Sequence, residues 1–393
     1  MDVPSPVMRQ MMKWWAVAVV MLLVVACSPA AQDTAGDASE EESDAGEPAD
    51  IATSEPTDAG DGEVVEVTYL LPFLRSIAFW PVHIAEELGY FEEEGLKVAS
   101  EATDGSSFVV QQVAANSAEF GIATAEPVLL GYEQNQNFQS VYEFLTGNVF
   151  DTWVLEQSPV QSLDDLEPGD SIAIKDLAGG EVPGLNVQLR NVGLEPDVDV
   201  QYTQFGENTG LGASLLADEE VQAMTISWNS LVGVDVALEE SGLQLRCISC
   251  DTETSLGSES VIVPNEFLTQ NEDLVIGHGR ALAKATLFGA TNPEAALEIM
   301  KKVNPEEQVD ADYAQAYFDA AVEIMQPRQP ENLYGWHDTD AWTRSMELLL
   351  APDVPSGLSN EVDVEALINN DLVEAYNDFD HDAVIQQAEE WTP

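Results

Sequence analysis

Three side chains that could bind a small ligand follow the first predicted strand, residues 64–71. Phe79 and Trp80 could stack on a planar ligand, although packing in a core is the ordinary use of such rings. Arg75 could pair with an anion, although a surface ion pair is equally compatible with its position. Ligands of open α/β sheets bind beyond the carboxyl ends of the strands, so these positions are candidates for a site.

Later strands are followed by similar residues. Glu126 comes after the predicted strand 119–123, where its carboxylate could accept hydrogen bonds from ring N–H or amino groups. The alternative is an acid that interacts with a helix dipole. Trp228 and Asn229 follow the predicted strand 221–226 and hold the equivalent place in the second half of the chain. This set favours a planar heteroaromatic ligand.

Small residues precede two predicted helices. Ser106 and Ser107 follow Gly105, and a second glycine-rich stretch covers residues 179–184. The free backbone N–H groups at a helix N-terminus suit a phosphate, sulfonate or carboxylate, although simple turns have the same composition. An anionic ligand is therefore a second candidate.

The remaining reactive residues give little sign of catalysis. Cys247 and Cys250 form a C-x-x-C pair, and outside a cell such a pair favours a disulfide over a metal or redox site. The four histidines lack H-x-x-x-H spacing, and the chain has no G-x-S-x-G, phosphate-loop or H-E-x-x-H motif. We expect no metal, no cofactor and no enzymatic activity.

The elements that must position these residues alternate between strand and helix, twice along the chain. Such alternation predicts an α/β protein whose mostly parallel sheets are covered by helices. A helical part follows, in which periodicity predicts helices over 273–291, 293–303 and 311–325. The predicted strands are 64–71, 96–99, 119–123 and 138–144 in the first unit, 171–174, 198–202, 221–226 and 243–248 in the second, and 260–263 on the return.

The N-terminus is predicted to be a targeting segment. Residues 14–26 are apolar, follow Arg9 and Lys13, and are too few to span a bilayer. Residues 24–27, VVAC, resemble a lipobox in which Cys27 is acylated. We therefore expect a lipoprotein signal peptide at 1–26. An acidic disordered tether at 27–63 would then hold the protein on the outer face of the cytoplasmic membrane.

The charge of the chain is strongly negative, with 72 Asp and Glu against 13 Lys and Arg and a net charge of −59. Such a surface excludes nucleic acid as the main partner. Residues 28–63 carry 12 acids and no base, and the chain from Val64 onward carries 59 acids against 11 bases. Self-repulsion of this size is relieved by salt, which predicts a halophilic or alkaline environment.

Three segments in order resemble the family that includes the sulfonate-, nitrate- and thiamine-pyrimidine-binding proteins of ABC importers. Residues 84–98 read IAEELGYFEEEGLKV and are similar to its A-x-E-x-G-Y-F-x-x-x-G-L-x-V signature. Residues 118–123, AEFGIA, match its G-x-A-D-F-G-I-A strand, with Ser117 in place of the usual glycine. Residues 163–174, LDDLEPGDSIAI, are similar to the segment that opens its second lobe.

This resemblance implies a type II periplasmic-binding fold, with two α/β lobes, a hinge and a ligand cleft between them. The expected lobes are 64–155 with 259–393, and 156–258, with crossovers at 152–156 and 258–262. The implied protein is a monomer that delivers a small molecule to the transmembrane subunits of an ABC permease.

Two further likenesses concern the ligand. Residues 125–130, AEPVLL, and the Trp228–Asn229 pair resemble segments of the heteroaromatic binders, which implies a thiamine-precursor pyrimidine or a riboflavin-like ligand. A sulfonate, taurine or nitrate is the alternative within the family. A pyrimidine-synthase-like enzyme and a ligand-sensing coreceptor are the rival classes.

Overall fold

The computed structural model describes residues 64–177, 180–206, 208–239, 241–250, 256–327, 332–350 and 357–393. The predicted signal peptide, the lipidation site Cys27 and the acidic tether lie outside the described residues. All of the elements below belong to one compact unit, Pro56–Pro393. Across the described part of the chain, no helix combines the length and the apolar character needed to cross a membrane.

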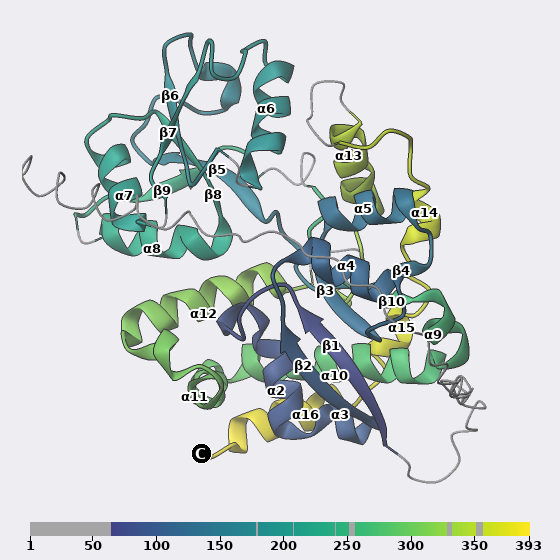
Figure 1. Cartoon of the computed structure of the whole chain (residues 1–393). Helices are drawn as coiled ribbons and strands as arrows, with labels where there is room; N and C mark the ends of the chain where they lie inside the picture. Colours follow the sequence, from purple (N-terminus) through teal and green to yellow (C-terminus); the bar gives the residue numbers. More distant parts are fainter. Residues whose placement is uncertain are drawn as a thin grey trace, which may run out of the picture. The chain divides into compact units, whose positions relative to one another are not determined.

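The first sheet has five strands in the order β2–β1–β3–β10–β4 (Figure 1). β1 runs parallel to both β2 and β3, and β10 runs antiparallel to β3 and β4. The parallel ladder of β1 and β2 pairs Val65 with Leu96 and continues to Leu71 and Ala102. These strands are β1 (Val65–Leu71), β2 (Leu96–Ala102), β3 (Phe120–Thr124), β4 (Phe138–Glu143) and β10 (Glu259–Pro264).

The second sheet repeats this arrangement, with the order β7–β6–β8–β5–β9. β6 is parallel to β7 and β8, while β5 is antiparallel to β8 and β9. Its strands are β5 (Phe150–Leu155), β6 (Ser171–Ile174), β7 (Gln201–Gln204), β8 (Ala223–Ser227) and β9 (Leu245–Cys247). The two-sheet α/β architecture expected from the sequence is confirmed. We call each sheet with its helices a lobe.

One expected boundary differs from the structure. The expected bounds put residues 150–155 in the first lobe, but backbone hydrogen bonds place β5 in the second sheet. The chain therefore crosses between the lobes before Phe150 and returns between Cys247 and Glu259. The physical reason is that an extended strand can pair with either sheet, and its sequence alone does not say which.

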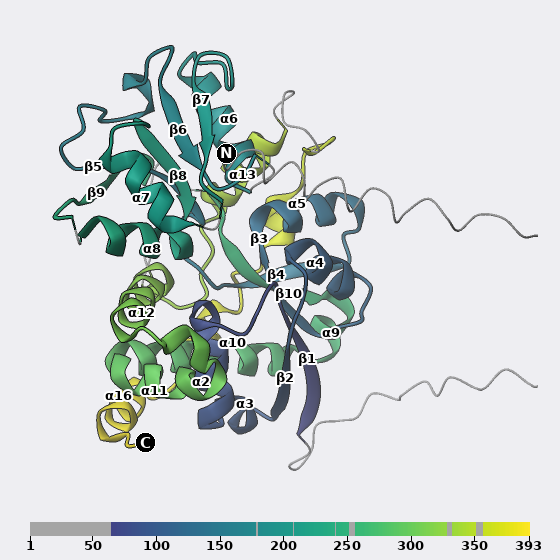
Figure 2. The same cartoon turned by 60° about the vertical axis from the view of Figure 1, so that its left-hand side comes forward.

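The helices lie around the sheets and at the C-terminal end of the chain (Figures 1 and 2). α2 ends at Gly89, which adopts a left-handed φ of 78° as a C-cap. In the first lobe the helices before the crossing are α2 (Trp80–Leu88), α3 (Tyr90–Glu93), α4 (Ser106–Ala114) and α5 (Ala125–Gln134), with the short 3₁₀ helix η1 (Ile77–Phe79). The second lobe has η2 (Leu163–Asp165), α6 (Glu181–Asn191), α7 (Thr209–Ala217) and α8 (Trp228–Glu239).

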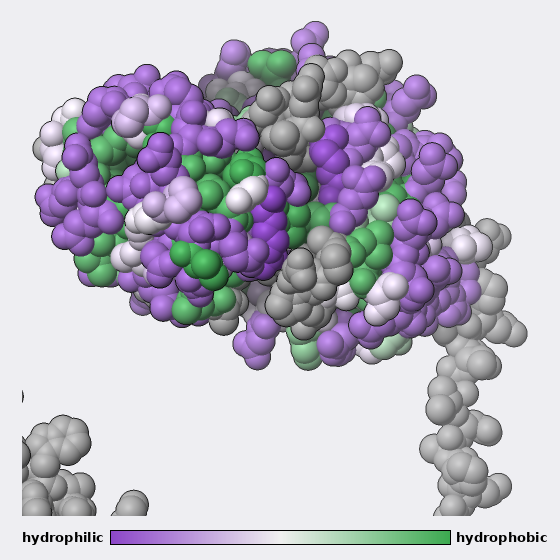
Figure 3. Space-filling model, turned by 90° about the horizontal axis from the view of Figure 1, so that it is seen from above, coloured by the Kyte–Doolittle hydropathy of each residue, from purple (hydrophilic) through white to green (hydrophobic). Residues whose placement is uncertain are grey.

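The chain after β10 is helical, and most of it covers the first lobe. Its elements are α9 (Asn265–Gln270), α10 (Glu272–Thr291), α11 (Pro293–Val303), η3 (Pro305–Gln308), α12 (Ala311–Met325), α13 (Thr339–Leu349), α14 (Val364–Leu367), α15 (Val373–Tyr376) and α16 (His381–Glu390). The largest buried cluster of apolar side chains joins β1 and β3 to α2, α10, α11 and α12. The second lobe has two smaller clusters, one on each face of its sheet. The surface drawn in Figure 3 is largely hydrophilic with smaller apolar areas, in keeping with the acidic composition.

Candidate ligand cleft

A cleft of about 620 Å³ is lined by residues of both lobes. Residues at the ends of β1, β3, β6 and β8 contribute to it, which is where open α/β sheets bind their ligands. The lining residues are Pro72, Phe73, Ala78, Gly105, Ser106, Thr124, Val149, Phe150, Lys175, Asp176, Gly180, Glu181, Gly206, Ser227, Trp228, Asn229 and Glu259.

Aromatic rings from three elements line the cleft. Phe73 follows β1 and is 37% exposed, Phe150 begins β5, and Trp228 begins α8 directly after β8. The Trp228 ring lies 5.6 Å from the Tyr317 ring of α12, so it is supported on one side. Planar faces that are only partly covered by protein can stack on a planar ligand.

Glu259 is the most unusual polar group in the cleft. It is the first residue of β10 and is only 7% exposed. Its carboxylate has no hydrogen-bond or ion-pair partner among the described residues, and it lines the cleft. Burial raises its pKa to about 7. Buried carboxyl groups are normally paired, so Glu259 can accept hydrogen bonds from a molecule in the cleft.

The remaining polar groups come from both lobes. Lys175 and Asp176 follow β6, and the buried carboxylate of Glu181 accepts the backbone N–H groups of Lys175 at 2.9 Å and Asp176 at 3.4 Å. In the first lobe the Oγ of Ser106 accepts the backbone N–H of Thr124 at 3.2 Å. Three carboxylates against one lysine, among the described lining residues, leave the cleft with a negative balance.

Of the side chains proposed as ligand contacts, Ser106, Trp228 and Asn229 line this cleft, as do Gly105 and residues 180 and 181 of the glycine-rich stretch. Glu126 lies in the first turn of α5 and lines an adjoining pocket of about 110 Å³. That pocket shares Thr124, Val149, Phe150, Gly180 and Glu181 with the cleft. Burial raises the pKa of Glu126.

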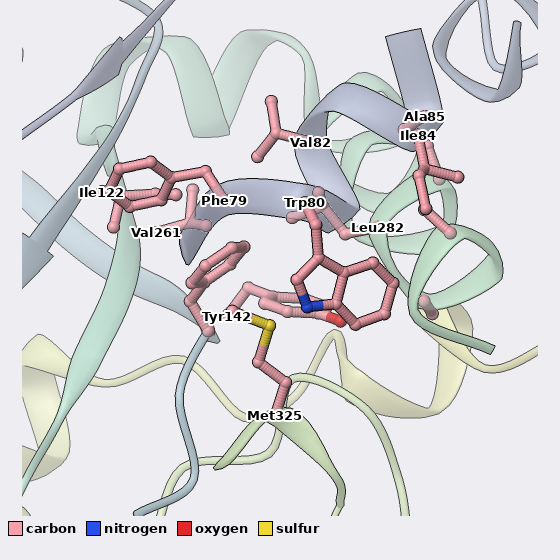
Figure 4. Packing of buried hydrophobic residues seen from close by; sticks show 14 of the residues in the cluster. Phe79, Trp80, Val82, Ile84, Ala85, Ile122, Tyr142, Val261, Leu282 and Met325 are labelled. Carbon is pink, nitrogen blue, oxygen red and sulfur yellow. The ribbon is translucent and has the colours of Figure 1, made fainter. Parts of the chain in front are cut away.

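Phe79 and Trp80 are core residues rather than ligand contacts. Both are fully buried among apolar side chains (Figure 4). The Trp80 ring packs against Phe318 with 5.1 Å between ring centroids. A Cβ atom at Gly289 of α10 would collide with the Trp80 ring, so the two elements pack in close contact. Their burial agrees with core packing, the alternative given for these rings, with Trp80 covered by α12 and Phe79 packed against Phe73 and Phe144.

Arg75 and Ser107 also lie away from the cleft. The guanidinium of Arg75 donates to Glu86 Oε2 at 2.6 Å and lies 3.2 Å from Nδ1 of His83. Arg75 and Glu86 therefore form a surface ion pair, which was the alternative to a role for Arg75 in anion binding. Ser107 is exposed on α4 and does not line the cleft.

Cys247 and Cys250 are joined by a disulfide with an S–S distance of 1.96 Å. With Asp151 they form the one group of metal-ligand types that is close enough to hold an ion in the described part of the chain. Because both sulfur atoms are oxidised, they are not available as thiolate ligands.

A second polar cluster resembles a catalytic arrangement but is closed to substrate. The Ser140 Oγ lies 2.7 Å from Nε2 of His337, and Nδ1 of His337 lies 3.0 Å from the side-chain oxygen of Asn370. Ser140 and His337 are both 0% exposed, and burial lowers the pKa of His337 to about 4. A nucleophile without access cannot attack a substrate, so this cluster stabilises the fold.

Sequence reasoning missed Lys175, Asp176, Phe73, Phe150 and Glu259. Lys175 and Asp176 directly follow the predicted strand 171–174, so the rule that selected Glu126 could have found them. The same rule, which selects residues that follow a strand, could not find Glu259, because Glu259 begins β10 and β10 is antiparallel to β3. Its first residue therefore pairs with Thr124, the last residue of β3, and lies at the same edge of the sheet.

Comparisons with known proteins agree with this architecture. The periplasmic aliphatic sulphonate binding protein SsuA of Escherichia coli superposes with a TM-score of 0.58 and 15% identity, over 78% of this chain and 92% of its own. A putative periplasmic sulfonate-binding protein SsuA of Methylobacillus flagellatus KT gives 0.56 and 17%, over 84% and 98%. A protein of Bordetella bronchiseptica RB50 gives 0.53 and 20%, over 79% and 96%. At these identities the superpositions show the fold alone.

The sequence also matches a family model. No curated protein sequence matches the chain. The model described as NMT1/THI5 like matches residues 76–296, which include all three family-like segments, the second lobe and the cleft residues from Ala78 to Glu259. Since the match spans more than half of the sequence, the chain belongs to the NMT1/THI5-like family.

Proposed function

We propose that this protein is the extracytoplasmic solute-binding component of an ABC importer and that its ligand is a small planar heteroaromatic molecule. The ligand class is a thiamine-precursor pyrimidine or a riboflavin-like ring system, delivered to the transmembrane subunits of a permease. The protein would act as a monomer held at the outer face of the cytoplasmic membrane through acylated Cys27. It would bind its ligand without converting it.

The observation that carries the ligand class is the unpaired carboxyl group of Glu259 at the base of an aromatic cleft. A ring N–H or exocyclic amino group would supply the missing hydrogen bond, and Phe73, Phe150 and Trp228 would supply planar contacts. A sulfonate would instead bring its negative charge close to Asp176, Glu181 and Glu259.

The arrangement of the lobes supports a binding role. The cleft residues come from both sheets, and the chain crosses between them more than once. A ligand that contacts both walls has more contacts when the lobes close, and this differential affinity drives closure.

A sulfonate, taurine or nitrate ligand is the second candidate. Lys175 lines the cleft, and so do Gly105 and Ser106 at the N-terminus of α4, where backbone N–H groups favour an anion. Two structural neighbours carry the name sulfonate-binding protein. In this case Lys175 would take the role that the sequence suggested for Arg75.

Thermal unfolding of the full chain in high salt tests the two ligand classes. The panel contains hydroxymethylpyrimidine, formylaminopyrimidine, thiamine, riboflavin, taurine, alkanesulfonates and nitrate. A ligand at about 100 times its Kd adds about 2.7 kcal/mol of stability, which raises Tm by several degrees. We expect the rise with a heterocycle. A rise only with sulfonates or nitrate would contradict the heteroaromatic proposal.

Two further measurements separate binding from the rival classes. Mass spectrometry of the released ligand should recover it unchanged, whereas an enzyme would return a product. Deletion of the gene should abolish uptake of the ligand, whereas a sensing coreceptor would leave uptake intact.

A further inference from the structure

The structure contains a second and larger cavity, of about 650 Å³. Its walls come from α8 and β5 of the second lobe, from α12, and from residues 333–341. Among the described lining residues, the cavity and the cleft share only Trp228. We call this space the rear cavity.

One face of α8 forms much of its wall. The lining residues of this helix recur at intervals of three and four, which places them on one side of the helix. They lie opposite α12, which runs beside α8 in both views of the fold (Figures 1 and 2). The α8 residues are Trp228, Leu231, Val232, Asp235, Val236 and Glu239.

Three tryptophan side chains line the rear cavity. Trp153 comes from β5, Trp228 from α8, and Trp336 from the segment before α13, and each is only partly buried. Indole is the aromatic side chain that attracts cations most strongly. The aliphatic wall provided by Leu231, Val236 and their neighbours would accept the apolar part of the same ligand.

The charges of the rear cavity are all negative. Its described lining contains the carboxyl groups of six residues and no lysine, arginine or histidine. Burial raises the pKa of one of them, Glu143, well above its ordinary value, so the negative charge comes from the other five. Glu143, Asp151 and Asp338 have hydrogen-bond donors nearby, for example the Trp342 indole N–H that donates to Glu143 at 2.8 Å. The other three, Asp235, Glu239 and Glu323, have no hydrogen-bond or ion-pair partner within the described part of the chain.

An acidic surface is common in this chain, so the carboxylates alone would not indicate a ligand. Here they border a partly open cavity lined by three tryptophans, and burial, together with the nearby charge of Glu239, raises the pKa of Asp235. In the described part of the chain, no group of three or more metal-ligand side chains close enough to hold an ion includes any of these three residues. A small hard cation would therefore lack a full set of protein ligands, whereas an organic cation needs no such set.

We propose that the rear cavity is a second binding site, for a small organic cation with an apolar body such as a quaternary ammonium compound. The ammonium group lies over the indole rings of Trp153 and Trp336, the unpaired carboxylates of α8 and α12 balance its charge, and the aliphatic wall covers its carbon atoms. This site is independent of the ligand proposed for the cleft.

The test is calorimetric titration of the purified full chain with choline and with benzyltrimethylammonium in one salt buffer. The uncharged isostere of choline, 3,3-dimethylbutan-1-ol, has the same shape without the charge. We expect saturable 1:1 binding of the cations and at least about tenfold weaker binding of the isostere. Equal affinity for choline and the isostere would overturn the proposal, and so would absence of saturable binding.

Substitutions locate the site. Trp153→Ala should weaken binding of benzyltrimethylammonium about tenfold, and Trp153→Phe, which keeps a ring, should weaken it less. Glu323→Gln removes one unpaired charge from the exposed surface of α12 and should weaken binding about threefold.

The matched control is Asp319→Asn, which removes the same charge from the same helix at an exposed position outside the cavity lining. We expect it to leave the affinity unchanged. An equal loss with Asp319→Asn and Glu323→Gln would mean that the cation binds the acidic surface in general, and the proposal would be wrong. Trp228 is left intact in these variants because it also lines the ligand cleft.

Discussion

Aromatic side chains follow a strand in both lobes, yet they have opposite environments. Phe79 and Trp80 follow β1 and are fully buried, whereas Trp228 follows β8 and lines both the cleft and the rear cavity. The difference comes from the chain after β10. α10 and α12 pack on Trp80 through Gly289 and Phe318 and bury it fully, whereas Tyr317 of α12 packs on one side of the Trp228 ring and leaves that ring partly exposed.

The end of a strand is a position where a side chain can contact a ligand, provided that no other element covers it. The covered position stabilises the fold through buried apolar area. The uncovered position leaves polar and aromatic groups without protein partners. Glu259 is the clearest example, because its buried carboxyl group lowers stability unless a ligand pairs with it.

The largest expected effect is a difference in stability between the alanine variants of Trp80 and Trp228. Trp80→Ala removes a fully buried indole and should lower the free energy of unfolding by about 3–5 kcal/mol. Trp228→Ala removes the same side chain from a partly exposed position and should lower it by about 1 kcal/mol. Denaturant unfolding of both variants measures the difference. Equal losses would show that Trp228 is packed as tightly as Trp80, and the comparison would fail.

The second effect concerns Glu259 and pH. Its pKa is raised from 4.5 to about 7 in the folded state, so between these values the folded protein keeps a proton that the unfolded chain releases. This group therefore lowers stability as pH rises through that window, by about 3 kcal/mol in total. Below pH 4.5 the group is protonated in both states and contributes no pH dependence.

Glu259→Gln isolates this contribution, because glutamine imitates the protonated acid and does not titrate. The variant and the original protein should have equal stability near pH 4, and the variant should be more stable at pH 8. Glu266→Gln on the surface of α9 is the control and should show no such divergence. If the stability difference for Glu259→Gln is the same at both pH values, the carboxyl group is ionised in the fold and has a partner.

The third expected effect is a change in the affinity for the cleft ligand. Trp228→Ala should weaken binding of the cleft ligand by about 1–3 kcal/mol, because a stacked aromatic contact at the centre of a site contributes this much. Trp336→Ala is the matched control, since Trp336 lines only the rear cavity. Calorimetric titration with the heterocycle that raises Tm measures both. Unchanged affinity in a folded Trp228→Ala variant would remove Trp228 from the cleft site.

Much of the fold followed from local signals. The alternation of strands and helices was sufficient to predict both sheets, and Gly89 ends α2 as its position suggested. Local signals did not reveal which sheet β5 joins, because a strand carries no mark of its partner. They also could not show that Trp80 is covered, since the residues that cover it, Gly289 and Phe318, lie more than 200 positions away.

The site residues that follow the carboxyl ends of parallel strands could be predicted from the sequence, and the others could not. Trp228 and Asn229 follow β8 and line the cleft as the rule predicts. Glu259 lies at the start of an antiparallel strand, and its proximity to Thr124 depends on strand pairing between distant segments. Its lack of a partner is a property of the packed structure, which no residue pattern encodes.

The smallest expected effect concerns Arg75, which the sequence suggested as an anchor for an anion. Its guanidinium is paired with Glu86 at 2.6 Å, and the two side chains are 40% and 19% exposed. Partly exposed ion pairs of this kind contribute up to about 1 kcal/mol, so Arg75→Ala should lower the free energy of unfolding by no more than that. Lys97→Ala, which breaks the more exposed pair of Lys97 and Glu66, is the matched control.

Arg75→Ala should leave affinity for every ligand of the panel unchanged, because Arg75 does not line the cleft. A loss of sulfonate or nitrate binding in Arg75→Ala that Lys175→Ala does not reproduce would move the anion site out of the cleft. The contrast between a covered first-lobe position and an open second-lobe position would then have to be abandoned for charged ligands.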